Sequence, residues 1–132
     1  MIVADTDVLI DYLCGTEPAA ERIAVELRAG HLGTTSVTRF ELLSGARTLR
    51  EENQLRELLE SMDCLPLDVD AADRAAAVRR ELERRRATIG MGDSMIAGIV
   101  LAAGGILLTR NRKHFERVTG LKLATLSTLP SD

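Results

Sequence analysis

The chain has 132 residues and a formal net charge of −3, with 45% hydrophobic but only 2% aromatic residues. This length suits one domain with a core of its own. So few aromatic side chains argue against a surface that stacks RNA bases, and the small negative charge argues against a general binder of polyanions. The positive charge is nevertheless concentrated between residues 79 and 122, so an acidic first half and a basic second half could face each other across a cleft.

Cysteine usage and hydropathy bear on the compartment. Cys14 and Cys64 stand alone, without the paired spacing of a disulfide framework, and are expected to be free thiols in a reducing environment. Asp5 interrupts the first apolar run too early for a secretory signal. The longest apolar stretch, residues 95–108, is short and contains glycines, so it does not suit a bilayer span. We therefore expect a cytoplasmic protein that does not bind membranes.

Short apolar segments alternate with longer amphipathic segments along the chain. Strands are predicted at residues 2–4, 31–35, 64–67, 106–109 and 122–125. Helices are predicted in the intervals between them, beginning at Asp7, Pro18, Ser36, Thr48, Asp70, Asp93 and Asn111. This alternation implies right-handed crossovers. The expected fold is α/β: one domain over residues 1–132, with a short, mostly parallel sheet of four to five strands and helices on both faces.

Two of the predicted helices show which side they bury. After Thr48 the apolar residues follow helical spacing, at Leu55, Leu58, Leu59 and Met62. After Ser36 the expected buried face consists of Val37, Phe40 and Leu43. Glu41 then borders that buried face.

Several polar residues occupy positions that meet at one edge of such a sheet. Asp5 ends the first strand, and Asn111 follows the strand predicted at residues 106–109. Asp93 opens the most apolar helix, and Glu41 lies one turn beyond Val37. Because ligands of open α/β sheets bind beyond the carboxyl ends of the strands, we expect these side chains to converge there.

Carboxylates on the buried side of a fold are costly unless they are paired, protonated or bound to a cation. No Lys or Arg lies at helical spacing from Asp93 to neutralise it. Several carboxylates without basic partners suit Mg²⁺, which takes oxygen ligands and keeps several waters. Its chemistry in proteins is phosphoryl and phosphodiester transfer, in which the ion activates water and polarises the phosphate.

Each acidic residue also has a purely structural interpretation. Asp5 can begin a turn, Asp7 and Asp93 can be ordinary N-caps, and Glu41 can be a solvated helix residue. For Asp7 the cap is favoured. Asp11 and the arginine cluster at residues 79–86 are expected on solvated surfaces, with Glu81 and Arg85 at ion-pairing distance along the helix.

Four segments carry a resemblance to a known family. They are Asp5-Thr6-Asp7-Val8, Phe40-Glu41-Leu42, Gly92-Asp93-Ser94-Met95-Ile96-Ala97 and Leu107-Leu108-Thr109-Arg110-Asn111-Arg112-Lys113-His114-Phe115. In order and spacing they resemble the motifs of PIN-domain ribonucleases, and most closely the VapC toxins of bacterial type II toxin–antitoxin pairs. The resemblance covers essentially the whole chain.

The resemblance implies a Mg²⁺- or Mn²⁺-dependent endoribonuclease. Asp5, Glu41 and Asp93 carry over as its acidic site, with Asp5 and Asp93 as the metal ligands. The fourth family position is often Asp, whereas this chain has Asn111, whose amide oxygen brings no negative charge. His114 receives no role. The resemblance also implies a homodimer that a cognate antitoxin protein inhibits, with an antitoxin segment in the groove beside the acids.

The resulting hypothesis is hydrolysis of an RNA phosphodiester bond by a metal-activated water. Glu41 would bind a metal-coordinated water or act as the base. Asn111 and Thr6 would position water or phosphate. The remaining substrate contacts would be made to the RNA backbone, which gives affinity without sequence reading. They are assigned to Arg110, Arg112 and Lys113.

Two other functions remain open from the sequence. A strand ending in Asp5-Thr6-Asp7 is also similar to haloacid-dehalogenase-type phosphatases, in which Asp5 would be the nucleophile. The order of the later motifs is wrong for that family, because the strand ending in Thr109 follows Asp93. The other alternative is a non-catalytic module that only binds RNA or protein, and Asn111 is the feature in its favour.

Overall fold

The five strands form one sheet in a computed structural model that describes residues 1–127. The strands are β1 (Ile2–Ala4), β2 (Leu32–Thr35), β3 (Asp63–Leu65), β4 (Ile106–Leu108) and β5 (Lys122–Leu123). Their order in the sheet is β3-β2-β1-β4-β5, and every neighbouring pair is parallel. This confirms the expected α/β fold. Residues 128–132 of the domain expected over residues 1–132 lie outside the described part.

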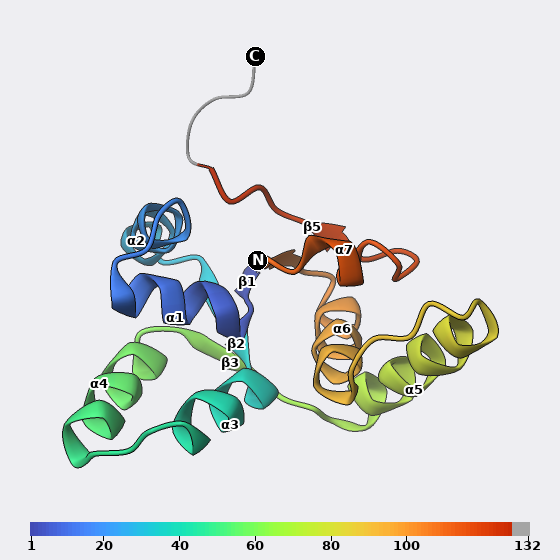
Figure 1. The fold of residues 1–132 in the computed structure, drawn as a ribbon, viewed down its shortest axis with the longest axis horizontal. Coiled ribbons are helices and arrows are strands. Elements are labelled where there is room, and N and C mark those ends of the chain that lie inside the picture. The colour runs from blue at the N-terminus through green and yellow to red at the C-terminus, as the bar shows by residue number, and fades with distance from the viewer. Residues whose placement is uncertain (128–132) are drawn as a thin grey trace.

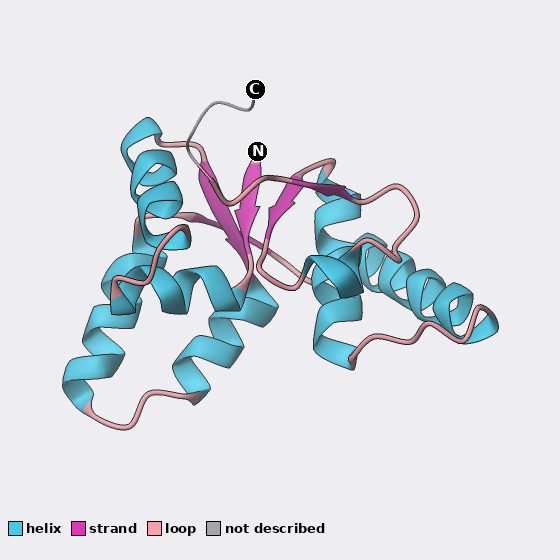
Figure 2. Ribbon diagram, turned by 45° about the horizontal axis from the view of Figure 1, so that its top comes forward, coloured by secondary structure: helices cyan, strands magenta, loops and turns pink. Residues whose placement is uncertain are grey.

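Helices cover both faces of this sheet. They are α1 (Thr6–Cys14), α2 (Ala19–Ala29), α3 (Ser36–Ser44), α4 (Leu49–Glu60), α5 (Val69–Arg84), α6 (Met91–Ala103) and α7 (Arg112–Phe115). In Figure 1, α1, α2 and α4 lie on one side of the strands, and α5, α6 and α7 lie on the other. Figure 2 shows the strands running between these two layers. Within residues 1–127, no helix has both the length and the hydrophobicity to cross a bilayer.

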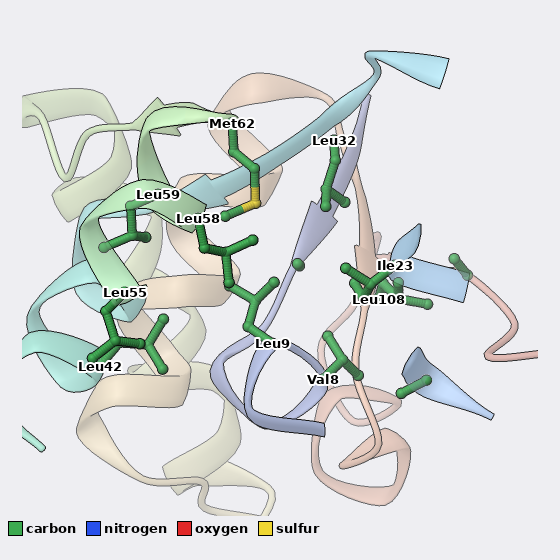
Figure 3. Packing of buried hydrophobic residues seen from close by; sticks show 13 residues of the cluster. Val8, Leu9, Ile23, Leu32, Leu42, Leu55, Leu58, Leu59, Met62 and Leu108 are labelled. Carbon is green, nitrogen blue, oxygen red and sulfur yellow. The ribbon is translucent and has the colours of Figure 1, made fainter. Parts of the chain in front are cut away.

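Consecutive residues of the central strands supply two separate cores. Ala4 and Leu108 pack into the cluster formed with α1, α2 and α4, part of which is shown in Figure 3. Val3 and Leu107 pack into the cluster formed with α5 and α6. Successive side chains of a strand point to opposite faces, so a strand buried on both faces must be apolar throughout. This explains why β1 and β4 are continuous apolar runs in the sequence.

Four helix starts differ from those expected. α6 begins at Met91 with Gly90 as its cap, so Asp93 lies in the first turn and is not an N-cap. The other three helices have side-chain caps. Asp5 caps α1 in place of Asp7, Thr35 caps α3 in place of Ser36, and Asp68 caps α5 in place of Asp70. Each cap has extended backbone geometry, and its side chain accepts a hydrogen bond from a backbone N–H of the first turn, as N-caps do. No loop separates β1 from α1 or β2 from α3. The cap of α1 is therefore the residue directly after β1, Asp5, and the cap of α3 is the last residue of β2, Thr35.

The buried side of α3 also differs from the expected one. Its buried residues are Val37, Thr38 and Leu42, whereas Phe40 is 71% exposed. The apolar pattern was misleading because the centre of the buried side is a polar residue, Thr38, which a hydropathy pattern does not count. The stripe expected on α4 is confirmed, since all its members are buried.

The packing of α5 against α6 depends on a glycine. A Cβ atom added to Gly98 would lie 2.5 Å from the carbonyl oxygen of Ala71 and 2.6 Å from the backbone nitrogen of Ala75. Both are backbone atoms, so neither can move aside cheaply. The two helices therefore approach each other more closely than any larger residue at position 98 permits.

We predict that Gly98→Ala lowers the free energy of unfolding by about 1–3 kcal/mol, the usual cost of overpacking a core. Gly45→Ala is the matched control, because its added Cβ would meet nothing closer than 3.5 Å and its φ is −84°. Urea denaturation of both variants measures the difference. Equal stability of Gly98→Ala and the wild-type chain would contradict this packing.

Candidate active site at the carboxyl edge of the sheet

Asp5 lies at the centre of the carboxyl edge, directly after β1. Its backbone N–H donates to the carbonyl of Leu108 at 2.9 Å, which extends the pairing of β1 with β4. One carboxylate oxygen accepts from the backbone N–H of Thr6 at 2.8 Å, and the other accepts from the hydroxyl of Thr109 at 2.7 Å. The residue is only 5% exposed. Asp5 is thus held in one orientation by donors from both sides.

Burial, together with the negative charges of Asp7 and Asp93, raises the pKa of Asp5 from 3.8 to about 7, and burial is the largest cause. The hydrogen bonds from Thr109 and Thr6 oppose this rise. Burial also raises the pKa of Asp7 and that of Asp93. The charges of Glu41 and Asp7 add to the rise at Asp93, and that of His114 counters it. These acids are therefore close enough to repel one another.

Asp7 connects α1 to the segment after β4. Its carboxylate oxygens accept from the backbone N–H of Arg110 at 3.1 and 3.3 Å. The Thr109 hydroxyl in turn accepts from the backbone N–H of Asn111 at 3.0 Å. The expectation that Asp7 is an N-cap is wrong, because the helix begins earlier and its side chain faces this segment. Asp7 and Thr109 thereby hold the backbone of the segment that leads from β4 to Asn111.

Asn111 reaches the site through its side chain. Its amide nitrogen donates to Oδ2 of Asp93 at 3.4 Å and lies 2.9 Å from Nδ1 of His114. Asn111 occupies the N-cap position of α7, but its side chain forms no capping bond there. His114 lies 3.7 Å from Oδ2 of Asp93. No role was predicted for His114 from the sequence, although its spacing of three residues from Asn111 places both on one side of a helical turn.

Glu41 reaches the site from α3. The hydroxyl of Thr6 donates to its Oε1 at 2.7 Å. Its Oε2 would lie 3.7 Å from a Cβ atom added to Gly92, so the carboxylate extends over the start of α6, where Asp93 lies. The structure thus brings Asp5, Glu41, Asp93 and Asn111 to one edge of the sheet, as the motif positions predicted.

Two of the three basic residues assigned to substrate binding have protein partners. Arg110 forms an ion pair with Asp11 at 2.7 Å, and Arg112 donates to the carbonyl of Ala124 at 2.7 Å. Lys113 is exposed and forms no ion pair within residues 1–127. The expectation that Asp11 is a surface residue is wrong: it is 7% exposed, because Arg110 covers it.

The donors at this edge are suited to a hard cation. They are carboxylate and amide oxygens, and no Lys or Arg in the described part of the chain forms an ion pair with Asp5, Glu41 or Asp93. Within residues 1–127, no three Asp, Glu, His or Cys side chains form a preassembled metal cluster. A Mg²⁺ ion needs only one or two carboxylates, with water completing its shell, so Asp5 and Asp93 could hold one.

The chain matches the PIN domain family over residues 2–121. It is 34% identical to a tRNA(fMet)-specific endonuclease VapC of Shigella flexneri over 122 residues, which cover 89% of this chain and 92% of the relative. It is also 34% identical to Ribonuclease VapC10 of Mycobacterium tuberculosis, over 92% of this chain and 91% of the relative.

Solved structures show the same architecture. DNA-bound VapBC from Salmonella typhimurium matches with a TM-score of 0.83 and 26% identity, over 95% of this chain and 97% of that chain. VapBC-1 from nontypeable Haemophilus influenzae matches with a TM-score of 0.80 and 25% identity, over 96% and 98% of the two chains. The chain therefore belongs to the PIN-domain family, in the group that contains the VapC ribonucleases.

Proposed function

We propose that this chain is a metal-dependent endoribonuclease that acts as the toxin of a type II toxin–antitoxin pair. The observation that carries the proposal is the buried, cation-free carboxylate of Asp5, with Asp93, Glu41 and Asn111 gathered beside it. Membership of the PIN-domain family agrees with this site and argues against the phosphatase alternative. Relatives named as VapC endonucleases support RNA as the substrate class.

Asp5 and Asp93 are the residues that would hold the metal. A bound Mg²⁺ or Mn²⁺ would supply the activation of a water molecule and the polarisation of the phosphate. Thr109 and the Thr6 N–H keep Asp5 turned toward the edge of the sheet, and Asn111 orients Asp93. Both ligands are therefore held before any ion arrives.

Glu41 and the basic residues would act on water and substrate. Glu41 belongs to the exposed side of the site, so its carboxylate can accept a proton from the attacking water or hold that water in place. Of the three assigned basic residues, Lys113 is exposed and forms no ion pair within the described residues, so it can contact a backbone phosphate. The Arg110 and Arg112 side chains are 53% and 39% exposed, so they can contact phosphate from their ion-paired positions.

An antitoxin partner is supported by the similar structures, which are VapBC complexes. A cavity of about 810 Å³ lies among α1, α3 and α4, lined by apolar residues such as Leu13, Leu42 and Leu55 and by the acids Glu41, Glu51 and Glu57. An amphipathic segment with basic residues would fit this groove. For the expected homodimer, the exposed Phe40, Val69 and Met91 offer apolar surface outside the groove.

We predict that Asp5→Asn and Asp93→Asn each lower the rate of Mg²⁺-dependent RNA cleavage by more than about 100-fold. Even residues that only support a metal ligand contribute about 10- to 100-fold, so loss of a ligand charge should cost more. Asn preserves the cap and the shape of each side chain, and circular dichroism would verify the fold. Asp73→Asn, which changes an exposed acid on α5, is the control and should cleave normally.

Undiminished cleavage by either site variant would refute the assignment of the metal ligands. Binding of RNA by the wild-type chain without cleavage, in either Mg²⁺ or Mn²⁺, would instead support the non-catalytic module. Both outcomes are visible in one gel-based assay with EDTA as the metal-free reference.

We predict that the metal-free protein becomes less stable as the pH rises from about 4 to about 7, in part through Asp5. The folded pKa of this carboxyl is about 7 and its ordinary value is 3.8. Between these values the folded state keeps a proton that the unfolded state has lost, so unfolding becomes easier with rising pH. Asp5→Asn lacks this contribution and should gain stability relative to the wild-type chain over that range.

Urea unfolding at about pH 5 and about pH 8, in EDTA, measures this effect. Parallel stability curves for the two proteins would show that Asp5 ionises normally in the folded state. Mg²⁺ added at the higher pH should stabilise the wild-type chain more than Asp5→Asn, because binding to the folded state raises its stability by mass action.

A further inference from the structure

A row of threonine hydroxyls leads from the interior to Glu41. Thr35 and Thr38 are fully buried at the junction of β2 and α3, and their hydroxyl oxygens are 3.2 Å apart. The Thr38 hydroxyl lies 3.1 Å from that of Thr6 on α1, which in turn lies 2.7 Å from Oε1 of Glu41. The row therefore joins two helices and ends on a carboxylate.

The hydrogens in this row can point in only one direction. An ionised carboxylate accepts and cannot donate, so Thr6 must donate its single hydroxyl hydrogen to Glu41. Thr38 must then donate to Thr6, and Thr35 donates to Thr38. Thr35 is free to do so because it accepts the backbone N–H of Thr38 at 3.0 Å. Every hydroxyl thus has one donor role, and the bonds reinforce one another in a buried setting.

Local backbone bonding gives these hydroxyls no alternative within their helices. A helical threonine often donates to the carbonyl four residues earlier. Thr6 is the first residue of α1 and Thr38 belongs to the first turn of α3, so the carbonyls four residues earlier lie in β1 and β2. The hydroxyls therefore bond to one another along the row. The row ends at Glu41, the acid proposed to bind or deprotonate the attacking water.

We infer that Thr38 is a positioning residue, which acts through Thr6 to hold the Glu41 carboxylate over the start of α6. This inference rests on the proposed ribonuclease function. Glu41 lies one helical turn after Thr38, and its side chain is otherwise exposed and has three rotatable bonds. With Oε1 bound by Thr6, Oε2 is left beside Gly92, next to Asp93. Thr38 itself is buried, so it touches neither the substrate nor the metal.

The test compares Thr38→Val with Thr34→Val. Thr34 is an equally buried threonine of β2, but its hydroxyl donates to the carbonyl of Ala4 at 2.9 Å and takes no part in the row. Both variants keep the side-chain shape and lose one buried hydroxyl, so both should lose similar stability. Only Thr38→Val should lower kcat, by about tenfold or more and with little change in KM, as misplacement of a catalytic group does.

Two further variants distinguish positioning from a general structural effect. Thr38→Ser keeps the hydroxyl and should restore most of the cleavage rate. In a Glu41→Gln background, Thr38→Val should cause no further loss, because a residue that acts through Glu41 has nothing left to position. If valine prevents folding at either site, Thr38→Ala and Thr34→Ala provide the same comparison.

Equal cleavage rates of Thr38→Val and Thr34→Val would overturn the inference, and so would a full additional loss in the Glu41→Gln background. Either result would leave the ribonuclease function intact, provided that the wild-type chain cleaves RNA in the same assay. Absence of metal-dependent cleavage by the wild-type chain would overturn the proposed function and, with it, this inference.

Discussion

The burial of the Asp5 carboxylate without a cationic partner is the constraint that organises the carboxyl edge of the sheet. Asp5 ends the central strand, caps the first helix and accepts hydrogen bonds on both carboxylate oxygens. Burial opposes its ionisation, and two neighbouring acids increase that opposition. A fold does not place acids together in this way for stability, since apolar residues would pack at lower cost. A positive charge beside Asp5 would favour its ionised form.

The surrounding fold brings the other acids to Asp5 by a simple geometric rule. β1 lies at the centre of a parallel sheet, so the chain leaves β1, β2 and β4 at the same edge. α1 and α3 begin at once after β1 and β2, which places Thr6 and Thr38 in their first turns. α7 begins after three intervening residues, the last of which is its cap, Asn111. Asp93 comes from α6, whose buried residues pack in the core that Val3 and Leu107 share with α5.

The sequence allowed the architecture and the main acids to be predicted because both depend on periodic or positional signals. Apolar strands buried on both faces and glycines at helix ends are visible without coordinates, and so are acids placed directly after strands. Phe40 was misjudged because hydropathy counts an exposed phenylalanine as core, and Thr38 was missed because hydropathy does not mark a threonine as buried. The links from Asp7 to Arg110 and from Arg110 to Asp11 join residues about a hundred positions apart, and no local pattern encodes such pairs.

The cavity among α1, α3 and α4 has a consequence for how such a protein can evolve. Glu41 lines this cavity and also belongs to the proposed catalytic edge. Under the proposed function, a partner that fills the cavity would contact a side chain that the reaction also needs. A substitution of Glu41 that weakened binding of the inhibitor would then also lower the cleavage activity. Selection for escape from the inhibitor and selection for toxicity would therefore oppose each other at this position.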